Sequence, residues 1–286
     1  MPASALMSDS LAAALRNHAF AYAAEVNTQL RRAGHGQHTG IHRARKALAR
    51  LRALLLLLRA TPRPADRLER QARALAHGLS KLRDAQAAYA IARRLAQRKH
   101  AADKRAAWRR VVAAIVAERD RLLAAARRVD PGFAQRSKRF AALRASMETY
   151  DWSAIESPDV KAALRHVIRR ARRARKAARA STDEALRHRL RRGARRALLQ
   201  IDLLLEIAGD TRQPRAAKQA HKLIERESHR RQMRKRLVDR LGDERDLQLL
   251  RRSLKRLPHA AAVDHALRAI DERLPRAIAA SNKVMD

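Results

Sequence analysis

Apolar positions recur every three or four residues through most of the chain, which is the spacing of helices that bury one face. The pattern predicts main helices at about 9–33, 41–60, 65–99, 103–128, 159–180, 184–208, 213–241 and 243–257. Shorter helical stretches are expected near 135–147 and 262–281. No convincing run of alternating β-branched residues accompanies them. The sequence therefore predicts an all-α fold.

The segment 41–59, IHRARKALARLRALLLLLR, places its two kinds of residue on opposite faces of a helix. Alanines and leucines between Ala44 and Leu58 share one face. Leu56 and Leu57 break the pattern, so the far end of this helix is expected to be buried nearly all round. The other face carries His42, Arg43, Arg45, Lys46, Arg50 and Arg52. This helix alone does not decide between a solvated basic face and an anion-binding face.

Composition changes that balance in favour of an anionic partner. The chain has 66 Lys and Arg against 28 Asp and Glu, a formal net charge of +38. Solubility requires far less charge than this, so a polyanion is the expected ligand. With 46% apolar residues, the 286-residue chain is long enough to bury one large core or two modest ones, and it is too apolar for a disordered basic tail.

Other features of the sequence predict a cytoplasmic protein without a membrane partner. The absence of cysteine excludes disulfides and thiolate metal sites. The first twenty residues lack the early positive charge and the uninterrupted apolar core of a signal peptide. The five leucines at 54–58 are far fewer than the ~20 apolar residues needed to cross a bilayer. The oligomeric state stays open.

The chain divides near its middle and repeats itself. ASMETYDWSAIESPDV, at 145–160, has four acidic residues and no basic ones, and it predicts a linker at 148–160 between a first helical bundle at 1–147 and a second at 161–286. HRARKALARLR, from His42, matches HRLRRGARRAL, from His188. LSKLRDAQ, at 79–86, matches LGDERDLQ, at 241–248. These pairs indicate an internal duplication, whose copies are expected to pack about a pseudo-twofold axis.

At these motifs the chain resembles the CHAD domain, the conserved histidine α-helical domain. The resemblance implies two antiparallel four-helix bundles with a basic groove or pore between them that binds inorganic polyphosphate without a cofactor. It leaves open a recruitment to polyphosphate granules. Carried over by position, the binding residues are His42, Arg45, Lys46, Arg50, Arg52 and Arg83 in the first half and His188, Arg191, Arg192, Arg195, Arg196 and Arg245 in the second. Ala49, Ser80 and Leu198 depart from the family pattern.

The chemistry of polyphosphate suits this composition. A line of phosphates without bases needs many cations and few aromatic platforms, and arginine donates two hydrogen bonds to one phosphate while staying charged. Aromatic residues make up only 3% of the chain, unlike in single-strand binders. The phosphate backbone of duplex nucleic acid remains the alternative ligand. The helix at 165–180 either is solvated or extends the site through Arg165, Arg169, Arg172 and Lys176.

We expect a binding protein and not an enzyme. Neither H-E-x-x-H nor G-x-x-x-x-G-K-[ST] occurs, no metal site is expected, and a metal-dependent polyphosphatase is the less favoured alternative. Asp84 and Asp246, each next to an arginine, are interpreted as helix caps or ion-pair partners and not as catalytic acids. Crowding by arginine should keep His42 and His188 neutral at pH 7. Whether these histidines contact phosphate or are structural stays open.

Overall fold

The computed structural model describes residues 9–61, 65–98, 101–179, 181 and 183–285, and every regular element within them is helical. The all-α prediction is therefore confirmed. The α-helices are α2 (Leu11–Gly34), α3 (His38–Leu55), α4 (Asp66–Gly78), α5 (Ser80–Ala96), α6 (Ala102–Val129), α7 (Ala134–Glu148), α8 (Ser157–Arg179), α9 (Glu184–Ala208), α10 (Pro214–Ser228), α11 (Arg231–Leu254) and α12 (Ala261–Met285). Short 3₁₀ helices η1 (Leu56–Ala60), η2 (Pro131–Phe133) and η3 (Trp152–Ala154) lie between them.

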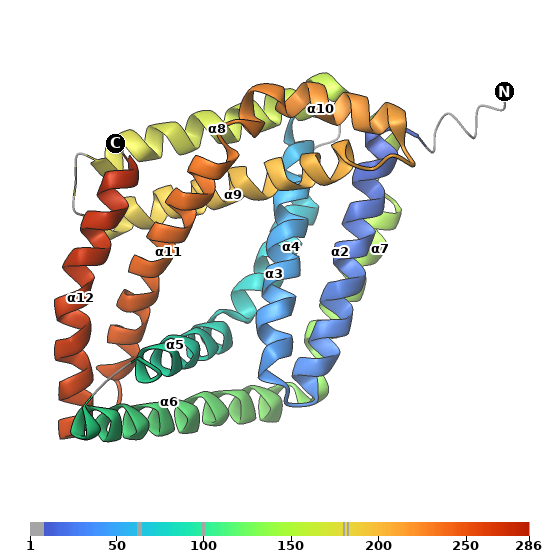
Figure 1. Cartoon of the computed structure of the whole chain (residues 1–286). Coiled ribbons are helices and arrows are strands. Elements are labelled where there is room, and N and C mark those ends of the chain that lie inside the picture. The colour runs from blue at the N-terminus through green and yellow to red at the C-terminus, as the bar shows by residue number, and fades with distance from the viewer. Residues whose placement is uncertain (1–8, 62–64, 99–100, 180, 182, 286) are drawn as a thin grey trace.

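Four helix pairs form a four-sided frame (Figure 1). The pairs are α2 with α3, α8 with α9, α11 with α12, and α5 with α6. One helix of each pair lies on the inner side of the frame, and each inner helix contacts the next, from α3 to α9, α11 and α5 and back to α3. We call these four helices the inner ring. The remaining helix of each pair supports the inner ring from outside.

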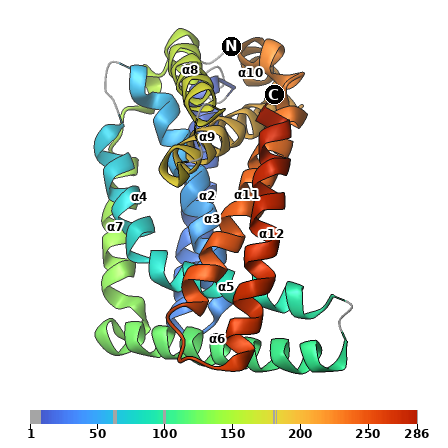
Figure 2. The same ribbon diagram turned by 90° about the vertical axis from the view of Figure 1, so that its left-hand side faces the viewer.

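Apolar side chains from both halves of the chain pack together. One cluster of buried residues combines α5 and α6 with α11 and α12, and Figure 2 shows α11 and α12 standing across α5 and α6. The larger cluster combines α2, α3, α4 and α7 with α8, α9 and α10. In the first half, α2, α3, α4 and α7 do contact one another as a group of four. The core is nevertheless not divided at the predicted boundary, and the two-bundle division stays a prediction.

The predicted faces of α3 and α9 agree with the observed burial. The apolar face of α3 is buried from Ala44 to Leu58, and Leu56 and Leu57 are buried as well, because η1 turns them against α8. On α9, Leu190 and Ile201 are 1% and 0% exposed. The cationic faces of the two helices are thereby turned away from the core.

Two predicted helix boundaries were wrong. The predicted helix 65–99 is interrupted at Leu79, which separates α4 from α5. The predicted break at Gly242 does not exist, because this glycine continues α11, and the chain breaks instead at His229 and Arg230. The predicted linker 148–160 contains η3 and the start of α8, and it is anchored by the buried Trp152, whose Nε1 donates to the Met147 carbonyl at 2.8 Å. None of the described helices is long and apolar enough to cross a membrane.

Candidate anion-binding site

All twelve predicted binding residues lie on helices of the inner ring, and nine of them form what we call the central cluster. α3 contributes three, α9 four, and α5 and α11 one each. On α3 and α9 the apolar side chains are buried, and the predicted histidines and cations lie on the remaining faces of these helices. The central cluster consists of His42, Arg45, Lys46, Arg83, His188, Arg191, Arg192, Arg195 and Arg245.

Charged side chains of different helices act on one another's pKa values, as side chains that lie close together do. Burial, then Lys46 on its own helix and Arg195 on α9, lower the pKa of His42. Arg83 on α5 contributes to the same lowering of the pKa. Burial, then the charge of Arg195, with smaller contributions from Arg83 and Arg245, lower the pKa of Arg191 to about 10. Arginines of α5, α9 and α11 therefore act on the charge of Arg191. Arg83 of α5 acts on residues of both α3 and α9.

Most of these cations form no ion pair within the described part of the chain, although the negative charge of Asp246 on α11 acts on Arg191 and Arg195. Among the residues that the structure describes, no ion pair involves Lys46, Arg191, Arg192 or Arg195. The Arg195 side chain is accessible to water, although protein atoms surround it on several sides. This partial enclosure and then the charge of Arg83 lower the pKa of Arg195. Like charges held together in a partly enclosed, water-accessible place favour a mobile anion as their partner.

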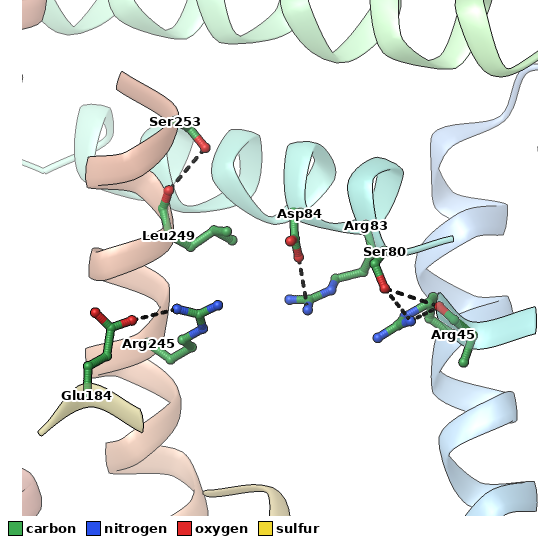
Figure 3. A network of polar contacts seen from close by, with 9 residues as sticks. Arg45, Ser80, Arg83, Asp84, Glu184, Arg245, Leu249 and Ser253 are labelled. Carbon is green, nitrogen blue, oxygen red and sulfur yellow. Dashed lines mark hydrogen bonds and ion pairs between the residues drawn. The ribbon is translucent and has the colours of Figure 1, made fainter. Parts of the chain in front are cut away.

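Three arginines of the central cluster are held by polar contacts that Figure 3 shows. Arg83 pairs with the neighbouring Asp84, Nη2 to Oδ1 at 2.9 Å. Arg245 on α11 donates from Nη1 to Glu184 at the start of α9, at 3.0 Å. Arg45 donates from Nη1 to the Ala76 carbonyl and to Ser80 Oγ, the latter at 3.2 Å. These contacts orient the guanidinium groups without neutralising the cluster, and the Asp84 contact agrees with the predicted role of an ion-pair partner.

The two copies of the motif differ at one supporting residue. Ser80 in the first half binds Arg45, whereas the equivalent Gly242 has no side chain to offer Arg191. A Cβ at Gly242 would lie 3.8 Å from Nη2 of Arg191, so the guanidinium passes directly beside the backbone. Nε of Arg191 is buried without a hydrogen-bond partner among the described residues. Arg191 is therefore the less engaged of the two equivalent arginines.

The two motif histidines are both favoured in their neutral form. Burial, followed by the charges of Arg245 and Arg192, lowers the pKa of His188, as burial and nearby cations do for His42. His42 is exposed to solvent, whereas Nδ1 of His188 is buried and has no partner among the described residues. A neutral imidazole adds a hydrogen-bonding group to the site without adding charge.

Sequence reasoning missed a buried ion pair beneath the second half of the site. Arg187 is 4% exposed and binds Glu244 through two hydrogen bonds, Nε to Oε1 at 2.7 Å and Nη2 to Oε2 at 2.5 Å. Its Nη1 also donates to Asn282 of α12 at 2.8 Å. The pair lines a small hollow beside His188 and Arg191, and it ties α9 to α11 and α12.

The other three predicted residues lie outside the central cluster. Arg50 stacks over the ring of Tyr22 on α2, with 5.8 Å between Cζ and the ring centroid. Arg52 faces the opposite way and binds Glu69 of α4, Nη2 to Oε1 at 2.7 Å. Arg196 is half-buried; burial, followed by Arg52, lowers its pKa. The predicted binding residues are thus divided. Nine form the central cluster, Arg50 lies beside Tyr22, and Arg52 and Arg196 lie near Glu69.

The possible extension lies on the outer helix α8. Arg165, Arg169, Arg172 and Lys176 are all exposed, and Arg172 approaches Glu227 of α10 at 3.7 Å. Figure 1 shows α8 outside α9, so these residues are not part of the central cluster. No group of three or more histidine, aspartate or glutamate side chains in the described part of the chain is arranged to hold a metal ion.

The sequence and the fold of this chain are similar to those of known proteins. The sequence model of the CHAD domain matches residues 13–226. The crystal structure of the CHAD domain from the plant Ricinus communis is similar over 96% of this chain and 91% of that chain, with a TM-score of 0.64 and 16% sequence identity. At this identity the likeness concerns the fold alone. A search of curated proteins gave no match.

Proposed function

Because the chain belongs to the CHAD domain family, we propose that it binds inorganic polyphosphate through the central cluster. The observation that carries the proposal is the set of inner-ring cations that form no ion pair among the described residues, of which Arg191, Arg192 and Arg195 lie within two turns of one helix. Bringing such charges together opposes folding, so the arrangement is explained by a ligand that neutralises it. Binding without cleavage, followed by recruitment to polyphosphate granules, is the function we propose.

The shape of the ligand favours polyphosphate over nucleic acid. The helices of the inner ring contact their neighbours all the way round, so a thin and flexible chain of phosphates fits among their side chains more readily than a duplex. The exposed arginines of α8 are the observation that keeps a nucleic-acid backbone as the second candidate. A metal-dependent polyphosphatase is a third and weaker candidate.

A direct competition tests the choice of ligand. Purified protein is mixed with labelled duplex DNA, and long-chain polyphosphate is added at ~150 mM salt, where weak backbone contacts to DNA are largely lost. We expect polyphosphate to bind at least about tenfold more tightly than the duplex, because it alone reaches the inner ring. Equal affinity, or a preference for DNA, would overturn the proposal.

A pair of double variants tests the place of binding. Arg45→Ala with Arg191→Ala removes two cations from the central cluster, and Arg127→Ala with Arg128→Ala removes two exposed cations from the end of α6. Each lost phosphate contact lowers the magnitude of the salt slope by about 0.7 to 1, so the first variant should lower it by roughly 1.5 to 2. The control should hardly change it. Equal losses in both variants would show that net charge alone governs binding.

A further inference from the structure

A second group of arginines surrounds the buried Glu69 where α3, α4, α8 and α9 meet. Glu69 has a side chain only 5% exposed and accepts hydrogen bonds from Arg52 and from Arg73, with nitrogen–oxygen distances of 2.7 Å and 3.2 Å. Arg196 on α9 and Arg170 on α8 complete the group. Burial and then the charge of Arg52 lower the pKa of Arg196, and Arg170 and Arg73 make smaller contributions in the same direction. The carboxylate of Glu69 raises this pKa. We call these five residues the Glu69 cluster.

The Glu69 cluster carries an excess of positive charge that a single buried carboxylate does not cancel. Arg52 and Arg73 bind the carboxylate of Glu69, Arg196 and Arg170 add two further positive charges nearby, and Arg73 and Arg170 are exposed to solvent. The carboxylate holds Arg52 and Arg73 in position, as a fixed counter-ion does beneath an anion site. No ion pair involves Arg170 or Arg196 among the residues that the structure describes.

The Glu69 cluster adjoins the central cluster along two helices. Arg196 directly follows Arg195 on α9, and Arg52 lies two turns beyond Arg45 on α3. Arg52 is among the charges that act on Arg45, after burial, Arg83 and Asp84. A phosphate chain bound at Arg195 and Arg45 therefore has a cationic continuation at Arg196 and Arg52.

The opposite side of the α3–α9 crossing has a different charge. There, Arg50 and Arg231 share an open hollow with Asp202 and Glu206. Arg231 pairs with Asp202 at 2.6 Å, and Tyr22 donates to Glu206 at 3.4 Å. Two cations and two carboxylates balance in this hollow, so it offers an anion no net attraction.

Resting on the proposed function, we infer that the Glu69 cluster is a second phosphate-binding site, through which a long polyphosphate chain leaves the central cluster toward α8 and away from Asp202 and Glu206. Beyond Arg170, the exposed Arg169 and Arg173 continue the positive surface of α8. Long chains should contact both sites, whereas a chain of three phosphates should contact the central cluster alone.

The test compares tripolyphosphate with long-chain polyphosphate on one pair of variants. Arg73→Ala with Arg170→Ala removes two exposed charges and leaves the Arg52–Glu69 pair intact, so the protein keeps its fold. For the long chain, we expect the magnitude of the salt slope to fall by about 1.4 and the affinity to fall roughly tenfold at ~150 mM salt. For tripolyphosphate, we expect no change. Arg127→Ala with Arg128→Ala is the matched control and should leave both ligands unaffected.

The outcomes separate the second site from the proposed function. Unchanged long-chain affinity in the variant, or an equal loss for both ligands, would overturn the second site while native binding stands. A loss of the same size in the control would also overturn it. If the native protein binds neither ligand, the proposed function fails and the second site fails with it.

Discussion

Replacing Arg191 by methionine should stabilise the protein when no ligand is bound. Burial and neighbouring arginines lower the pKa of Arg191 well below that of a free arginine, to about 10, and its Nε has no hydrogen-bond partner among the described residues. At 1.36 kcal/mol for each pH unit, this difference corresponds to about 3 kcal/mol that opposes the charged side chain in the folded state. Methionine retains most of the volume, so the substitution removes the charge without leaving a large cavity.

The sign of this effect follows from the direction of the pKa. A cation whose pKa is lower in the folded state than in the unfolded state destabilises the fold at every pH below about 10. The penalty fades only as the pH rises through about 10 toward the pKa of a free arginine. At pH 7 the full penalty applies, so Arg191→Met removes it.

Arg45→Met is the matched control, because the pKa of Arg45 is also lowered to about 10, by burial and then by Arg83. Arg45, however, donates hydrogen bonds to the Ala76 carbonyl and to Ser80. Hydrogen bonds from charged groups contribute about 1.5–3 kcal/mol each, which offsets the relief of the charge. We therefore expect little net change in the free energy of unfolding for this variant.

Thermal unfolding followed by circular dichroism at pH 7 measures the difference. Since 1 kcal/mol shifts the melting temperature by about 2–4 °C in chains near this size, Arg191→Met should raise it by roughly 5 °C or more, and Arg45→Met should change it by less than about 2 °C. Polyphosphate should then stabilise Arg191→Met less than the native protein. A clear fall in the melting temperature of ligand-free Arg191→Met would show that this arginine holds the fold together, and it would refute the reasoning.

Three further results are expected. Long-chain polyphosphate at 100 times its Kd should stabilise the native protein by about 2.7 kcal/mol in a melting experiment at matched chloride, and an unchanged melting temperature would contradict the central cluster as the site. Glu244→Ala should cost about 3–5 kcal/mol in urea unfolding because it leaves Arg187 buried and unpaired, and Arg187→Met with Glu244→Leu should recover most of that loss; equal losses would contradict this account. Because the pKa values of His42 and His188 are lowered in the fold, stability should decline as the pH falls below 6.5, and a His42→Gln/His188→Gln variant should show a shallower decline between pH 7 and 5.

Local patterns in the sequence predicted the faces of the helices well. The apolar positions of α3 and α9 are buried as their spacing indicates, because a helix fixes the direction of each side chain relative to its neighbours. The break between α10 and α11 was not predictable in this way. No glycine or proline lies at His229 and Arg230, and Gly242, the residue that suggested a break, continues a helix.

The division of the basic residues depended on contacts that no local pattern contains. Arg50 and Arg52 differ by about 200° around α3, so they lie on opposite sides of the helix. Arg50 meets Asp202 and Glu206 because α3 crosses α9, where Gln200 donates to the Ala53 carbonyl at 2.9 Å. Arg52 meets Glu69 because α4 packs against α3. Glu244, the buried partner of Arg187, likewise lies 57 residues further along the chain, and no local sequence pattern at either residue predicts the ion pair.

The core that α5 and α6 share with α11 and α12 has a consequence for synthesis on the ribosome. The apolar face that contains Ile91 and Ile115 is covered only after Leu250 and Ile270 have been synthesised. About 130 residues separate the two groups, so at 5–20 residues per second the first group remains open for roughly 7 to 25 seconds. Over that interval, a polyanion that gathers the arginines of α3 and α5 would also screen their mutual repulsion. The nascent chain therefore depends on its last quarter to close a surface that its first half has already made.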